Sequence, residues 1–139
     1  MTPEPLSSIL QSRWALLLAR VLVTLPYWES ALMRLLDVRG GEAEMSHFGL
    51  TPAWAFNWAT LGVQAIGSAL VISNRWTWLG AGALGVFTVL TIPIAHAFWT
   101  MSGQSALEAH HVAVEHMGMI GGLILVSILA NRSDGLLEG

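Results

Sequence analysis

The chain contains no cysteine, which excludes disulfides, thiol redox chemistry and cysteine metal sites on this chain. Charge is also scarce, because only 11% of the 139 residues are charged, against about 25% in ordinary soluble domains. The small net charge of −3 gives no reason to expect nucleic acid as a partner. The first residues lack a basic segment that leads into an apolar run and a cleavage site, so we expect no cleaved signal peptide.

Long apolar blocks dominate the rest of the chain, which is 54% hydrophobic with a mean hydropathy of +0.60. Each block is close to the roughly 20 residues that a membrane-spanning helix needs, and nothing alternates like a strand. We predict an all-α integral membrane four-helix bundle, antiparallel in up-down-up-down order. Its domain covers residues 13–131, between a polar lead at 1–12 and a polar tail at 132–139. The predicted helices are 13–36, 53–73, 76–99 and 106–130, with a polar loop from 37 to 52.

Basic residues give a prediction for orientation. If the N-terminus is cytoplasmic, Arg13, Arg75 and Arg132 all fall on the cytoplasmic side. The positive-inside rule therefore favours a multi-pass protein with both termini in the cytoplasm. We expect the protein to be surrounded by the lipid bilayer.

Ionisable residues gather towards one membrane face in this arrangement. The up-down order brings together the polar ends of all four blocks, and these carry all five histidines: His47, His96, His110, His111 and His116. Residues at i, i+4, i+7 and i+11 share a helix face. Three such polar stripes are predicted to face the bundle interior, because lipid offers them no partners. They are Arg20-Thr24-Tyr27-Ala31, Asn57-Leu61-Gln64-Ser68 and His111-Glu115-Gly118-Gly122.

Three functions fit these polar groups. A quinone site needs proton donors near the carbonyl groups, and His96, Glu115 and His116 could supply and relay protons, since imidazole titrates near neutral pH. A haem or metal site is a second reading, because histidine binds zinc, copper and haem iron. A packing or scaffold role without chemistry is the third, since polar residues also join helices or reach headgroups.

Several segments resemble the DoxX family of small four-helix membrane proteins over roughly residues 13–131. The stretch TIPIAHAFW at 91–99 resembles the family's T-x-x-x-x-H-x-F-W motif, and Arg20-Val21-Leu22 resembles the start of its first helix. Arg34 stands at the place of a family lysine. Gln64-Ala65-Ile66-Gly67 stands at the family's Glu-x-x-Gly-Gly, and Glu115-His116 replaces the more usual Lys or Asn before Gly121-Gly122.

The resemblance implies an integral inner-membrane (cytoplasmic-membrane) protein linked to redox or sulfur metabolism, related to the DoxD subunit of thiosulfate:quinone oxidoreductase. We therefore predict a redox-associated, quinone-interacting subunit with a membrane or peripheral oxidoreductase as partner. The predicted catalytic residues are His96, Glu115 and His116, and the predicted cofactor-binding residues are Arg20, Gln64, Trp99 and His111. The alternatives are a non-enzymatic scaffold or transport-accessory protein and a haem or metal-binding protein. Catalysis by this chain and a homo-oligomer both stay open.

Overall fold

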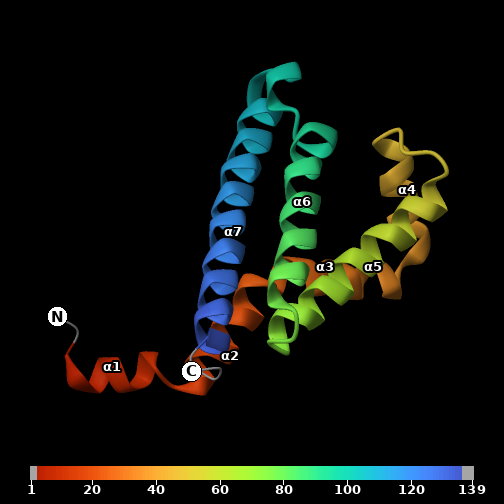
Figure 1. Ribbon diagram of the computed structural model, residues 1–139. Helices are drawn as coiled ribbons and strands as arrows, with labels where there is room; N and C mark the ends of the chain where they lie inside the picture. The colour runs from red at the N-terminus through yellow and green to blue at the C-terminus, as the bar shows by residue number, and fades with distance from the viewer. Residues whose placement is uncertain (1–2, 136–139) are drawn as a thin grey trace.

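The computed structural model describes residues 3–135, and every regular element in this range is helical (Figure 1). The predicted all-α class is confirmed. The helices are α1 (Glu4–Leu10), α2 (Arg13–Val23), α3 (Leu25–Leu36), α4 (Val38–His47), α5 (Ala53–Ile72), α6 (Thr77–Ala95), the 3-10 turn η1 (Phe98–Thr100) and α7 (Gly103–Gly135).

Three helical segments are long and apolar enough to cross a membrane: Ala53–Ile72, Thr77–Thr100 and Gly103–Arg132. A fourth crossing is counted only if α1 and α2, which meet at 59°, are taken as one bent span. The described part of the chain thus has three to four candidate crossings, each near the length that the hydrocarbon core requires.

The first predicted helix, 13–36, is wrong as a single element, because the chain breaks at Thr24 into α2 and α3. Pro26 lies in the first turn of α3, where its missing N–H cannot continue the hydrogen bonding of the preceding helix. The indole of Trp28 donates instead to the backbone carbonyl of Val21 at 3.2 Å. A side chain therefore replaces part of the backbone bonding at the break.

Two segments predicted as irregular are helical, which corrects the sequence analysis. The polar lead at 1–12 contains α1, and the polar loop at 37–52 contains α4. Asp37 supplies the helix-start signal for α4, because its carboxylate accepts the backbone N–H of Gly40 at 2.9 Å. The polar composition and the paired glycines of α4 concealed this helix from a search for apolar periodicity.

The helices α5, α6 and α7 form the centre of the molecule. Helix α6 packs against both α5 and α7, and α7 runs antiparallel to it beyond η1 (Figure 1). Where α5 crosses α6, a Cβ added to Gly80 would lie 2.7 Å from the carbonyl oxygen of Gly67. The two backbones can approach this closely because neither residue has a side chain. Beyond their shared turn, α5 and α6 spread apart (Figure 1).

The last two helices differ from the predicted bounds of 76–99 and 106–130. Helix α6 ends at Ala95, shortly after Pro93, and His96 takes non-helical backbone angles as its C-cap. Helix α7 begins at Gly103 and continues to Gly135. His96 is therefore held at a helix end, where its ring can turn towards α7.

Candidate functional site

A cavity of about 330 Å³ lies between α3, α4 and α5 on one side and α6 and α7 on the other. This volume falls at the lower end of the range for small-molecule sites. The phenyl rings of Phe48, Phe56 and Phe87 form an apolar part of the cavity wall. The polar residues of its lining are Ser30, Arg34, Glu44, Thr60, Gln64, Thr91, His96 and His116.

Two histidines meet at one end of this cavity. The rings of His96 and His116 lie edge to face, with centroids 5.2 Å apart. Both side chains are half-buried, and the backbone N–H of His96 donates to the carbonyl of Ile92 at 2.9 Å. Nδ1 of His116 is buried without a hydrogen-bond partner among the described residues. The pair thus brings two proton-exchanging groups from α6 and α7 to one cavity wall.

Gln64 contributes an amide from α5. Its side chain is only 4% exposed, and Oε1 has no hydrogen-bond partner within residues 3–135. One turn further along α5, the hydroxyl of Ser68 is also buried and unpaired within the described range. A buried polar atom without a partner costs about 1–3 kcal/mol. Because Gln64 lines the cavity and Ser68 does not, the Gln64 amide is the candidate for contact with a bound molecule.

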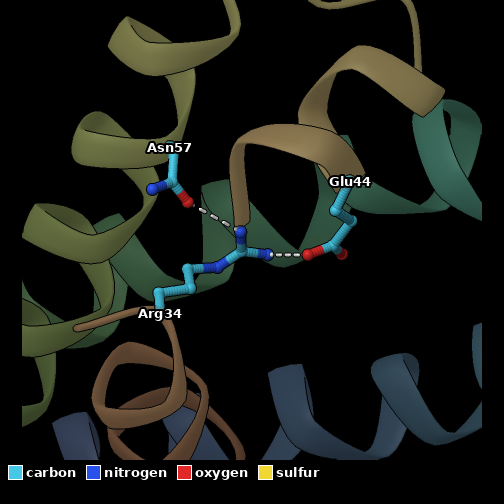
Figure 2. Close-up of polar contacts among 3 residues, drawn as sticks. All are labelled: Arg34, Glu44 and Asn57. Atoms are coloured by element: carbon cyan, nitrogen blue, oxygen red, sulfur yellow. Dashed lines mark hydrogen bonds and ion pairs between the residues drawn. The ribbon is translucent and has the colours of Figure 1, made fainter. Parts of the chain in front are cut away.

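Arg34 forms the charged part of the cavity lining, and Figure 2 shows its guanidinium between Asn57 of α5 and Glu44 of α4. Its Nη1 donates to Asn57 Oδ1 at 3.0 Å, and its Nη2 lies 2.7 Å from Glu44 Oε2. The arginine side chain is 10% exposed and that of Glu44 is 48% exposed. Because the two partners come from different helices, this arginine joins α3 to both α4 and α5.

Arg34 and Glu44 line the cavity but were not among the predicted site residues. The signal for Arg34 was its position at the place of a family lysine. Glu44 could not be found by helical spacing, because α4 was predicted as a loop. The half-exposed carboxylate reaches the cavity only because the capped α4 folds back over α3 and α5.

The predicted site residues separate into two groups in the structure. His96, His116 and Gln64 line the cavity. The other four lie outside its lining: Glu115 and His111 are exposed on α7, Trp99 is 58% exposed on η1, and Arg20 is half-buried on α2.

The polar stripes predicted on the first two spanning helices are confirmed as interior faces at the residues named here. Thr24, Tyr27, Asn57, Gln64 and Ser68 are all buried. Tyr27 Oη and Thr88 Oγ1 lie 2.6 Å apart, which joins α3 to α6.

The predicted interior stripe on α7 is wrong for His111, Glu115 and Gly118, which are exposed, whereas Ala109 and Ala113 are buried. Its last member, Gly122, is half-buried, and a Cβ added there would lie 2.7 Å from the side chain of Val23. The helix packs chiefly on α6, and its small alanines allow the closer contact. His116 belongs to this packed face, one residue on from Glu115, which explains why only one of the two neighbours reaches the cavity.

Among residues 3–135, no three histidine, aspartate or glutamate side chains are grouped so that they could hold a metal ion.

The fold and the spanning helices define a multi-pass helical membrane protein. The DoxX family model matches residues 15–97, which is more than half of the chain, and the chain belongs to the DoxX family. The match includes Arg34, Glu44, Gln64 and His96, whereas His116 lies beyond it. Comparisons with curated proteins and with solved structures give no match.

Proposed function

We propose that this DoxX protein is a redox-associated membrane subunit that binds a quinone head group in the cavity between α3–α5 and α6–α7. The observation that carries the proposal is the meeting of His96, His116 and Gln64 around one cavity with aromatic walls. The proposed setting is the inner membrane with both termini cytoplasmic. The proposed arrangement is an antiparallel four-helix bundle whose first crossing comes from the chain before α4.

Quinone chemistry needs hydrogen-bonding groups at the two carbonyl oxygens and an apolar surround. An imidazole can donate through one nitrogen and accept through the other, and a glutamine amide can do the same from the opposite wall. Phe48, Phe56 and Phe87 offer faces against which an aromatic ring packs favourably. Gln64 Oε1 and His116 Nδ1, which lack partners among the described residues, are available to a ligand hydroxyl.

Reduction of a quinone to its hydroquinone takes up two electrons and two protons. In the proposed mechanism, the electrons come from a membrane or peripheral oxidoreductase partner. His96 and His116 hold and pass the protons, because imidazole changes charge near physiological pH. Oxidation of the hydroquinone runs the same proton path in reverse. Arg34 positions α4 over the cavity through Glu44 and does not exchange protons, since a guanidinium stays charged.

Binding of a quinone to the purified protein tests this function. The protein in detergent is titrated with a benzoquinone or naphthoquinone homologue, and saturable quenching of its tryptophan fluorescence is measured. We expect one site per chain. Linear quenching without saturation, together with no heat of binding by calorimetry, would sink the proposal. A visible spectrum and metal analysis of the same sample test the haem or metal alternative.

The second candidate is a scaffold or transport-accessory role, and the exposed α7 residues favour it. Glu115 and His111 are exposed on α7, as are Glu108 and His110 nearer the start of the same helix. Ionisable groups on a membrane helix need headgroups, water or another protein as partners. A larger complex, or a second copy of the chain, would meet that need. Cross-linking in the native membrane from position 115 identifies which neighbour is present.

A further inference from the structure

An apolar groove of about 480 Å³ runs between α5 and α6, outside the polar cavity. Val63 lines it from α5, and Leu79, Ala83 and Val86 line it from α6. Phe87 and Leu90 border both this groove and the cavity. The two spaces therefore adjoin at these two side chains.

The sequence of α6 explains why the groove follows the helix. Positions 79, 83, 86, 90 and 94 repeat at helical spacing and share one face. At 1.5 Å per residue, this stripe extends about 22 Å, most of the way across the hydrocarbon core. Near its start lies Gly82, where an added Cβ would meet no described atom within 4 Å. The divergence of α5 and α6 beyond their crossing at Gly67 and Gly80 leaves this side of α6 uncovered (Figure 1).

We propose that this groove takes the isoprenoid or alkyl tail of a lipid-soluble quinone whose head group lies in the polar cavity. The inference rests on the proposed function. It specifies the ligand further, as a membrane quinone with a long tail. Continuity with the cavity at Phe87 and Leu90 selects this occupant over an unrelated lipid chain. A head group beside His96 and His116 has its tail directed past Phe87 along α6, towards Trp78 at the other end of the helix.

A second apolar groove, about 510 Å³, lies between α6 and α7 and provides a matched control. It shares Leu90 with the polar cavity but does not include Phe87. Ala83 lines only the α5–α6 groove, and Gly85 lines only the α6–α7 groove. The two grooves share Trp78, Gly82, Val86 and Leu90, so a phenylalanine is placed at the two positions that each line one groove alone.

The experiment measures binding of two quinones that share one head group, one without a tail and one with a tail of ten carbons. Wild type, Ala83→Phe and Gly85→Phe are titrated in the same detergent, so that partition of the tailed quinone into micelles is common to all three. We expect Ala83→Phe to weaken binding of the tailed quinone by roughly tenfold, a loss of about 1.4 kcal/mol. Binding of the tail-less quinone should stay unchanged, and Gly85→Phe should match wild type for both. Val63→Phe fills the same groove from α5 and replaces Ala83→Phe if that variant does not fold.

The outcomes separate the two proposals. If both quinones bind and neither groove-filling variant distinguishes them, the tail assignment is wrong while the head-group site stands. If Gly85→Phe alone weakens the tailed quinone, the tail lies between α6 and α7 and the assignment is overturned. If neither quinone binds to wild type, the proposed function itself fails. If an ordinary phospholipid displaces the tailed quinone but not the tail-less one, the groove is a general lipid site and the assignment is again overturned.

Discussion

The imidazole of His96 at the end of α6 meets the imidazole of His116 on α7 edge to face, with ring centroids 5.2 Å apart. We predict that His96→Ala and His116→Ala each weaken quinone binding by about tenfold, because each removes one hydrogen bond to the ligand worth about 1 kcal/mol or slightly more. Fluorescence titration of the purified variants measures this.

His111→Ala is the matched control for the histidine prediction. His111 is exposed on the same helix and lies outside the cavity lining, so its loss should leave quinone affinity unchanged. Glu115→Gln should behave in the same way. An equal loss of affinity in the His111 and His116 variants would show that the site is on the outer face of α7.

Asn57→Leu is predicted to destabilise the protein by about 1–3 kcal/mol, because it leaves Nη1 of the buried Arg34 without its acceptor. Thermal unfolding in detergent, followed by circular dichroism, gives the measurement. Glu44→Gln is the comparison, and it should cost much less, since a half-exposed carboxylate contributes little to an ion pair. If the Glu44 variant unfolds at the lower temperature, the ion pair of Arg34 with α4, and not its hydrogen bond to α5, contributes more to stability.

Tyr27→Phe is predicted to lower stability by about 1 kcal/mol. Thr88 Oγ1 already donates its proton to the carbonyl of Leu84 at 2.7 Å, so the tyrosine hydroxyl is the donor in the 2.6 Å contact. The Tyr27→Phe variant therefore loses this hydrogen bond, and only an acceptor lone pair of Thr88 Oγ1 is left without a partner. The chain has a single tyrosine, so its ultraviolet resonance Raman signal reports this hydrogen bond directly. A wild-type spectrum of a hydroxyl that accepts rather than donates would contradict the assignment.

Gly80→Ala and Gly82→Ala should change stability in opposite directions. A Cβ at position 80 meets the backbone oxygen of Gly67, so the helices must separate at a cost of about 1–3 kcal/mol. A Cβ at position 82 meets no described atom within 4 Å, so this variant gains up to about 1 kcal/mol of helix propensity. The unfolding temperatures of the two variants measure these changes in stability. Equal effects would show that α5 and α6 are not held at this crossing.

The sequence predicted that the long apolar segments are helical, although not where the last two helices begin and end, because apolar runs of spanning length have few alternatives. It also placed the polar faces of α3 and α5 correctly, since buried polar residues at helical spacing must turn inward. The buried face of α7 could not be predicted in this way. Histidine and glutamate at the i and i+4 positions suggested one interior stripe, while the buried residues Ala109 and Ala113 lie two positions before them, on nearly the opposite face of the helix.

The charged part of the site depended on tertiary structure. Arg34 reaches Glu44 only after Asp37 caps α4 and the chain folds back at that point. Pairing of this kind joins residues from separate helices and leaves no periodic signal in either segment. His96 was predicted from the gathering of histidines at one membrane face and from the family motif, but the end of α6 at Ala95, which precedes its contact with His116, was not predicted.

The α5–α6 groove is open on one side. This determines whether its occupancy by a ligand depends on the ligand's concentration in the membrane or in water. A molecule lying along this groove is already dissolved in the hydrocarbon layer before it is bound. Its saturation should therefore follow its mole fraction among the lipids and not its concentration in water. Reconstituted vesicles diluted in buffer at a constant quinone-to-lipid ratio should keep the same occupancy, whereas added empty lipid should lower it.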